Sequence, residues 1–307
     1  MEWANDRGAC GPRRNKGGAR RLCGYNYAVD PAGACLVCGC RTARRRYEVN
    51  GFGIVECACG LARTAVPADF DPESIYTEAY FSGGRADGYA DYENSADALH
   101  AEFRRIVTVL QEYVPAGRLV EYGCAYGFFL EVAQQAFTGF GIEVSDHARQ
   151  SCLDRGLDVV RHVTPEELVD RGPFDAAVML DVIEHLADPE SVLEQLHASM
   201  RPGGHLLITT GDYGSLLARV MGRRWRLMTP PQHLWFFTPH TLTTLLEQRG
   251  FRVHVLDHPR KLVPLELVAY QASRYLRAQR LVRRFPLRGS IPVNLFDAMR
   301  VVAERIG

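Results

Sequence analysis

The stretch Leu119-Val-Glu-Tyr-Gly-Cys-Ala-Tyr-Gly-Phe-Phe-Leu130 is followed further along the chain by Gly141-Ile-Glu-Val144. This order of residues predicts a buried strand, a glycine-bearing turn, the start of a helix and a second strand ending near an acidic residue. Gly123 and Gly127 let the backbone turn sharply and approach a ligand where a side chain would clash. Glu143, at the tip of the second strand, can accept hydrogen bonds from ribose hydroxyls. The stretch therefore predicts a site for a nucleoside-shaped ligand.

The turn differs from one that wraps a pyrophosphate. Only three residues separate its glycines, with Ala125 in the middle, whereas dinucleotide sites use G-x-G-x-x-G. Glu121 stands directly before the turn, where a carboxylate repels phosphate and attracts an amine. We therefore expect a nucleoside with a zwitterionic tail, S-adenosylmethionine. The residues expected to bind it from this part of the chain are Glu121, Gly123, Cys124, Ala125, Gly127, Glu143, Val144 and Asp181.

From about residue 31 onward the chain resembles class I methyltransferases of a broad bacterial group with an N-terminal zinc-ribbon-like module. Besides the turn, the resemblance is carried by Gly141-Ile-Glu-Val-Ser145, Asp181-Val-Ile-Glu-His-Leu186, Arg201-Pro-Gly-Gly204, Pro231-Gln-His-Leu-Trp-Phe-Phe237 and Ala298-Met-Arg-Val-Val-Ala303. The group usually has glycine where this chain has Ala125, whose methyl narrows the approach to the methionine tail. The resemblance implies an α/β fold with a Rossmann-like seven-stranded sheet, and a cofactor lid that includes Tyr80, Tyr89 and Tyr92.

Changes in composition and periodicity divide the chain. We predict a disordered tail over 1–30, a zinc-ribbon-like module over 31–64, a linker with lid helices over 65–115, and the cofactor-binding domain over 116–307 with an insertion at 259–297. An apolar stripe of Leu99, Phe103, Ile106, Val107 and Leu110 predicts a helix over 96–113. The insertion carries a basic helical pattern from Arg274 to Arg284. That pattern is typical of a solvated face, but it could contact an anionic substrate group or form a homodimer.

Short apolar segments alternate with helical patterns from residue 117 to 211. The expected strands are 118–122, 139–144, 158–160, 176–180 and 205–210, with two more at 251–257 and 298–303. This alternation predicts a parallel sheet with helices on both faces.

Five of the nine cysteines cluster between residues 35 and 59. Cys35-Leu-Val-Cys38-Gly is a metal-binding knuckle, and Cys57-Ala-Cys59-Gly is a second, irregular one with a single residue between the thiols. An apparent hairpin over 47–55 separates them, which is typical of a zinc ribbon. We predict a structural zinc ion on Cys35, Cys38, Cys57 and Cys59. The sequence leaves open whether Cys40 replaces Cys57, and whether the ribbon has lost its metal.

Methyl transfer to a hydroxyl needs a base near the carboxyl ends of the strands. His185 follows Asp181 and the fourth strand, and His233 lies in a proline-bounded aromatic loop. Either histidine could be the base or have a structural role, and Tyr213 could assist. A metal at Glu184 and His185 is disfavoured because no further ligand is spaced nearby.

The balance of charge points away from nucleic acid and membranes. Lysine plus arginine and aspartate plus glutamate both number 36. No apolar run approaches a membrane span and no signal peptide is recognised, so we expect a cytoplasmic protein. The activity predicted is methylation of a small molecule, at a hydroxyl of a sugar or secondary metabolite. The alternatives are methylation of structured RNA gripped by the ribbon, and a non-catalytic scaffold that retains the fold.

Overall fold

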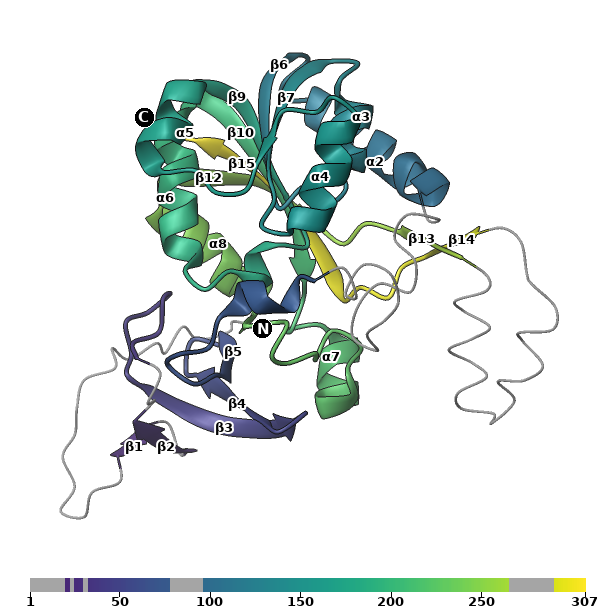
Figure 1. The fold of residues 1–307 in the computed structure, drawn as a ribbon. Helices are drawn as coiled ribbons and strands as arrows, with labels where there is room; N and C mark the ends of the chain where they lie inside the picture. The colour runs from purple at the N-terminus through teal and green to yellow at the C-terminus, as the bar shows by residue number, and fades with distance from the viewer. Residues whose placement is uncertain (1–19, 23–24, 30–32, 78–95, 265–289) are drawn as a thin grey trace, which may run out of the picture.

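The computed structural model describes residues 20–22, 25–29, 33–77, 96–264 and 290–307 (Figure 1). Tyr80, Tyr89 and Tyr92 of the expected lid lie outside the described residues, as does the basic segment from Arg274 to Arg284.

A seven-stranded sheet forms the centre of the molecule, as the sequence predicted. Its strands are β6 (Gly117–Tyr122), β7 (Phe137–Ile142), β8 (Val159–Val160), β9 (Phe174–Leu180), β10 (Met200–Gly211), β12 (Phe251–Asp257) and β15 (Ala298–Arg305). They are ordered β12-β15-β10-β9-β6-β7-β8. The chain leaves β6 for β7 on one side and returns to β9 on the other. This reversal beside β6 is where α/β sheets open a crevice for ligands.

The prediction of a parallel sheet is wrong for one strand. β15 runs antiparallel to both β10 and β12. The short strands β13 (Lys261–Pro264) and β14 (Ser290–Val293) pair antiparallel, so the chain returns to the edge where β12 ends. β15 therefore starts at that edge and runs back, whereas a parallel strand would need a crossover to the opposite edge.

Helices cover both faces of the central sheet (Figure 1). One face carries α2 (Ala96–Gln111), α3 (Phe128–Ala133) and α4 (Asp146–Asp154); the other carries α5 (Pro165–Arg171), α6 (Pro189–Ser199) and α8 (Pro239–Gln248). On the first face Phe103 and Leu110 of α2 pack with Phe129 of α3. Phe103 and Leu110 belong to the apolar stripe that predicted α2, because the buried side of an amphipathic helix repeats every third or fourth residue.

A second sheet lies below the first in Figure 1. Its order is β1 (Arg20–Leu22), β2 (Tyr25–Val29), β3 (Thr42–Val49), β4 (Phe52–Cys57), β5 (Ala62–Ala65) and β11 (Trp235–Phe236). The hairpin expected near residues 47–55 is present as β3 and β4. β1 and β2 lie within residues 1–30, the region that the sequence predicts to be a disordered tail. There the backbone of residues 28–29 pairs with residues 42–43 of β3, an edge whose hydrogen-bonding groups the sequence did not reveal.

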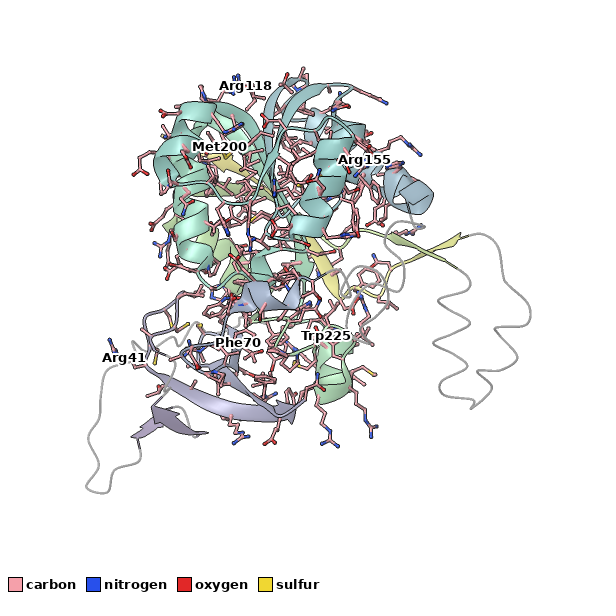
Figure 2. The ribbon with its side chains drawn as sticks, viewed as in Figure 1. Arg41, Phe70, Arg118, Arg155, Met200 and Trp225 are labelled. Carbon is pink, nitrogen blue, oxygen red and sulfur yellow. The ribbon has the colours of Figure 1, made fainter. Side chains whose placement is uncertain are left out.

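The two sheets share one core. β11 comes from the region predicted as the cofactor-binding domain, yet it pairs with β5 of the cysteine module. Trp225, next to α7 (Leu216–Met221) in Figure 2, packs with Ile54 of β4 and Phe236 of β11. The cysteine module is therefore packed into the larger domain. Within the described part of the chain, no helix combines the length and apolar character needed to cross a membrane.

Candidate active site

A cavity of about 820 Å³ opens at the carboxyl edge of β6, β7, β9 and β10. It is closed on other sides by the short helix η1 (Pro72–Ile75), by α2, and by the turn η3 (Ile183–His185). Most residues expected at the site line it: Glu121, Gly123, Cys124, Ala125, Glu143, Val144, Asp181, His185 and His233. The topology thus brings together segments that are separated by more than a hundred residues in the chain.

The glycine turn has the conformation that its residues predicted. Gly123 and Gly127 have φ of +75° and +73°, a region that side chains make costly. Ala125 also lies in this region, with φ of +47°. The position where the related group has glycine therefore holds a residue under mild backbone strain. The amide of Ala125 is aimed at Glu143, so the strained turn is tied directly to the second strand.

Glu143 is fixed by the backbone on both oxygens. Its Oε2 accepts a hydrogen bond from the Ala125 amide at 2.8 Å, and its Oε1 accepts one from the Ser145 amide at 2.7 Å. Burial raises the pKa of Glu143, and the two amide hydrogen bonds oppose this shift. Each carboxylate oxygen retains a second lone pair. Glu143 is thus a rigid acceptor that can still receive hydroxyl donors from the cavity.

Glu121 is a buried carboxyl group of the cavity whose hydrogen bonding is incomplete among the residues that the structure describes. Its side chain is 3% exposed, and within the described residues its Oε2 has no hydrogen-bond partner. Burial raises the pKa of Glu121 well above the usual range of a carboxyl group. A buried acceptor without a donor costs about 1–3 kcal/mol. A cationic or amine-bearing ligand in the cavity would satisfy it.

Gly127 is not among the residues that line the cavity, and its contact with the ligand stays a prediction. A Cβ there would point toward α4, 2.4 Å from Cδ1 of Leu157 and 3.0 Å from Sγ of Cys152. Gly127 is needed for close packing of the turn against α4, because any side chain would collide with this layer.

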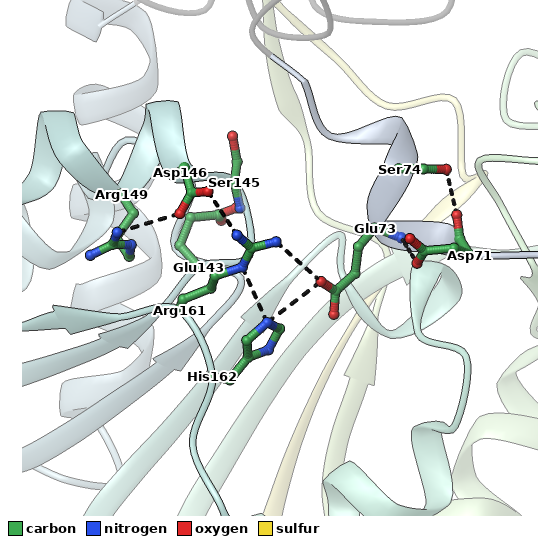
Figure 3. Close-up of polar contacts among 9 residues, drawn as sticks. All are labelled: Asp71, Glu73, Ser74, Glu143, Ser145, Asp146, Arg149, Arg161 and His162. Carbon is green, nitrogen blue, oxygen red and sulfur yellow. Dashed lines mark hydrogen bonds and ion pairs between the residues drawn. The ribbon is translucent and has the colours of Figure 1, made fainter.

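The short helix η1 lines the cavity and lies in the 65–115 segment predicted to hold lid helices, although its own bounds were not predicted. Figure 3 shows Glu73 of η1 facing Arg161 and His162. Asp71 caps it by accepting a hydrogen bond from the Glu73 amide at 3.0 Å. Arg161 lies between Glu73 of η1, at 3.7 Å, and Asp146 of α4, at 2.7 Å. The signal was Asp71-Pro72-Glu73, a capping residue before a first-turn proline. Ile75 of η1 is 5% exposed and belongs to the same apolar cluster as Phe103 of α2, so buried packing holds the short helix beside the cavity, and the half-exposed pair of Glu73 and Arg161 adds a surface contact.

Two histidine rings meet in the opposite half of the cavity. The centroids of His185 and His233 are 4.6 Å apart, with their planes at 89°. Nδ1 of His185 lies 2.9 Å from the carbonyl oxygen of Gln232. Because a carbonyl can only accept, Nδ1 carries the hydrogen, and the lone pair of the ring is on Nε2. His185 is therefore held in the tautomer that can accept a proton at Nε2.

Burial keeps both imidazoles neutral. It lowers the pKa of His185 to about 4, against a smaller opposing effect of the Gln232 carbonyl. It lowers the pKa of His233 well below the usual value, and the neighbouring His185 acts in the same direction. At neutral pH both rings are unprotonated. They can accept a proton from a substrate that enters the cavity.

Glu184 anchors the turn that carries His185. Its carboxylate accepts a hydrogen bond from the Thr210 hydroxyl at 2.8 Å, and its carbonyl accepts one from the Leu234 amide at 2.8 Å. Glu184, His185 and His233 each have a donor atom within 4.8 Å of the others. The fold thus brings His233 close to Glu184 and His185, which sequence spacing did not show.

Tyr213, predicted to assist the base, is not among the residues that line the cavity, and its assisting role stays a prediction. Its hydroxyl donates to Glu56 of β4 at 3.1 Å, and Glu56 also pairs with Arg46 at 2.9 Å. Burial raises the pKa of Tyr213, and the neighbouring carboxylate of Glu56 acts in the same direction. Tyr213 joins the two sheets because its side chain is turned toward β4.

Several residues that line the cavity were not predicted individually as site residues. Arg226, Leu227, Thr229 and Gln232 line the cavity from the loop before β11. Nε of Arg226 lies 2.9 Å from Asp297, so this guanidinium is held beside the cavity by a buried carboxylate. The loop was recognised as an aromatic, proline-bounded segment. Which of its polar side chains face inward depends on the turn after Pro231.

The four predicted zinc ligands converge. Cys35, Cys38, Cys57 and Cys59 each have Sγ within 4.8 Å of the other three. The Sγ–Sγ distance is 3.6 Å between Cys35 and Cys59 and 3.4 Å between Cys38 and Cys57. Hydrogen bonds from the thiols of Cys57 and Cys59 lower the pKa of Cys35 to about 2. Cys40 is not part of this group, and its Sγ lies 3.1 Å from the Thr42 hydroxyl. The geometry therefore favours Cys57 over Cys40.

A family model described as a methyltransferase domain matches residues 96–256, just over half of the chain. The chain belongs to this family. The prediction of a methyltransferase is thereby confirmed at the level of the family. The matched region of this methyltransferase contains both glutamates and both histidines of the cavity, whereas the cysteine module lies outside it.

Curated relatives of the methyltransferase include two ubiquinone biosynthesis O-methyltransferases. That of Dinoroseobacter shibae is 34% identical over 146 residues, 43% of this chain and 59% of the relative. That of Methylococcus capsulatus is 30% identical over 162 residues, 49% of this chain and 68% of the relative. The chain thus spans only 59% of the length of the first. A solved S-adenosylmethionine-dependent methyltransferase from Archaeoglobus fulgidus gives a TM-score of 0.47 at 20% identity, covering 68% of this chain and 94% of that one.

Proposed function

We propose that this chain transfers a methyl group from S-adenosylmethionine to a hydroxyl of a small molecule, a sugar or a secondary metabolite. The observation that carries the proposal is the pairing, within one cavity, of two buried glutamates beside the turn and two neutral histidines opposite them. A volume of about 820 Å³ is within the range of small-molecule sites.

The glutamate half fits the cofactor. Glu143, fixed by two backbone amides, would accept the ribose hydroxyls, and the partnerless oxygen of Glu121 would lie toward the positively charged methionine end. Glu121 would then be ionised, because a cation offsets the burial that raises its pKa. When bound, S-adenosylmethionine supplies an activated methyl group and leaves as S-adenosylhomocysteine.

The histidine half fits a hydroxyl acceptor. The acceptor oxygen must lose its proton as it gains the methyl group, and Nε2 of His185 has the free lone pair to take that proton. The Gln232 carbonyl, which accepts from Nδ1, would hold the ring and stabilise the imidazolium that forms. We therefore assign His185 as the base. His233, whose ring packs against that of His185, would form the neighbouring part of the cavity wall.

The identity of the acceptor atom is supported by the relatives. Two of them are named as O-methyltransferases, which favours oxygen over nitrogen or carbon. The apolar side chains of Leu180, Leu186 and Leu227 line the cavity together with Arg226. This lining suits a small organic acceptor that has an apolar part and carries a polar or anionic substituent.

We further propose a structural zinc ion on Cys35, Cys38, Cys57 and Cys59. Four convergent thiols match a closed tetrahedral site, which leaves no position for a substrate. The ion would hold the turn after β4 against the turn that precedes β3.

The decisive experiment measures cofactor binding and turnover separately. Calorimetry with S-adenosylhomocysteine should give a saturable isotherm. Release of S-adenosylhomocysteine should then be followed with a phenol, a catechol, a sugar, an amine and a structured RNA. Turnover with hydroxyl compounds supports the proposal; turnover with RNA alone points to the nucleic-acid alternative. A folded protein that shows no binding at millimolar cofactor would support the scaffold alternative.

Two histidine variants test the assignment of the base. His185→Gln should lower kcat roughly 100-fold or more while leaving the affinity for S-adenosylhomocysteine nearly unchanged. His233→Gln should have a smaller effect on kcat. The reverse order would move the role of base to His233.

A further inference from the structure

The loop that carries His233 is held on two sides. On one side the Leu234 amide donates to the carbonyl of Glu184, and the indole of Trp235 donates to the carbonyl of Leu186 at 2.8 Å. These bonds tie the loop to η3, the turn of the other histidine. On the opposite side, the loop is bound by β5 of the cysteine module.

On that opposite side, Thr64 of β5 contacts the backbone of His233 and Leu234 directly. Its hydroxyl donates to the carbonyl of His233 at 2.6 Å, and its amide donates to the carbonyl of Leu234 at 2.9 Å. Thr64 is 4% exposed, so water cannot replace it. The peptide between His233 and Leu234 is therefore fixed from both faces, by Thr64 and by η3.

The pairing continues along the strand. Arg63 is opposite Trp235 and Ala62 is opposite Phe236, which adds the segment directly after His233 to the sheet of the cysteine module. Asn50, in the turn between β3 and β4, donates to the carbonyl of Pro230 at 3.0 Å. The loop from Pro230 to Phe236 thus has backbone contacts from both ends of the β3–β4–β5 meander.

The thiol cluster lies beside the start of β5, the strand that carries Thr64. The Cys57 amide donates to the carbonyl of Leu61 at 2.9 Å, which closes the turn between β4 and β5. Cys59 sits in that turn, directly before β5 begins at Ala62. An ion on the thiols would therefore fix the start of the strand that carries Thr64.

We propose that the cysteine module positions His233 and its neighbour His185 for the reaction, with Thr64 as the positioning residue. This inference rests on the proposed function. It gives the thiol site a role in acceptor chemistry although none of the four thiols lines the cavity. The cofactor half is formed by β6, β7 and the glycine turn, and Thr64 does not contact it.

The test compares Thr64→Val with Thr64→Ser and with the control Thr42→Val. Valine retains the shape of threonine but loses the hydroxyl, and serine retains the hydroxyl. Thr42 is also buried in the cysteine module, but its hydroxyl contacts Cys40 and not the loop. All three variants should keep the zinc content and the affinity for S-adenosylhomocysteine of the parent protein.

Thr64→Val should lower kcat/KM for the acceptor about tenfold, because a misplaced group near the reacting atoms slows turnover steeply. Thr64→Ser should restore most of the loss, and Thr42→Val should leave kcat/KM within about twofold of the parent. An unchanged kcat/KM in Thr64→Val would overturn the inference.

Hydrogen–deuterium exchange gives a readout that does not need an acceptor. In Thr64→Val, and after removal of the metal with a chelator, the amides of residues 233–236 should exchange about tenfold faster, while those of β6 should not change. If the loop amides exchange at the same rate in the parent protein, in Thr64→Val and in the metal-free protein, the inference is overturned even if methyl transfer is confirmed. Faster exchange in a protein that binds no cofactor would support the positioning and refute the proposed function alone.

Discussion

Gly123→Ala tests whether the cofactor turn is packed against the turn that bears His185. A Cβ at Gly123 would lie 2.7 Å from Cγ2 of Val182 and 3.1 Å from Cγ1. Rotation of Val182 about χ1 can place the hydrogen of its Cβ at only one of these two positions, so a methyl group stays at the other and the residue itself must move. Val182 directly precedes η3, and its displacement would therefore reach His185.

The expected magnitude has two parts. A non-glycine residue at φ of +75° costs about 1 kcal/mol, and overpacking against Val182 adds about 1–3 kcal/mol. Gly123→Ala should therefore lower the free energy of unfolding by about 2–4 kcal/mol. Gly156 is the matched control, because its φ is +76° and a Cβ there would have no neighbour within 4 Å. Gly156→Ala should cost only about 1 kcal/mol.

Urea unfolding gives the free energy of unfolding of each variant. The difference between the two values is the cost of packing the added methyl group against Val182. Calorimetry with S-adenosylhomocysteine should show affinity about tenfold lower in Gly123→Ala and unchanged in Gly156→Ala, equivalent to about 1.4 kcal/mol. Equal stability of the two variants would show that Val182 does not pack on the turn. Reduced stability with full affinity would show that the turn and the ligand site are independent.

Three further predictions address the glutamate, the histidine and the metal. Glu143→Gln should weaken S-adenosylhomocysteine binding by about 1–3 kcal/mol in calorimetry, since one acceptor oxygen is lost, and Glu112→Gln, a control at an exposed residue outside the cavity, should not. The pKa of His185 falls from 6.5 unfolded to about 4 folded, so only the unfolded chain takes up a proton as the pH falls through this window. The free energy of unfolding should drop by about 1–3 kcal/mol between pH 6.5 and 4 relative to His185→Gln, and parallel urea titrations of the two proteins would contradict this. Cys38→Ser should release zinc, measured by elemental analysis, and lower the urea midpoint without changing affinity for S-adenosylhomocysteine; a variant that keeps one zinc per chain would exclude Cys38 as a ligand.

Local patterns accounted for most of the cofactor half. The strand ending at Tyr122, the turn at Gly123 and the acidic tip at Glu143 are adjacent in sequence or joined by one crossover. A parallel pair with a short connection has few alternative arrangements. The two cysteine knuckles were likewise recognisable, because their ligand spacing is local.

Residues whose role depends on distant contacts were not predictable. η1 lies beside the cavity because its Ile75 is buried in the same apolar cluster as Phe103, and Tyr213 is turned toward β4, where Glu56 accepts a hydrogen bond from its hydroxyl. Neither partner is close in sequence, and a hydrogen bond leaves no periodic signal in the chain. The same reason explains why β11 was not assigned to the cysteine module.

The sequence by itself determined the α/β sheet, the glycine turn, the glutamate at the end of β7 and the thiol set, since each depends on periodicity or spacing within a short segment. Only the tertiary structure decided that His185 and His233 share one wall of the cavity, and that Thr64 of the cysteine module supports that wall. The physical reason is that these contacts join segments far apart in the chain, and folding brings such segments together through buried apolar packing, which does not specify partners residue by residue.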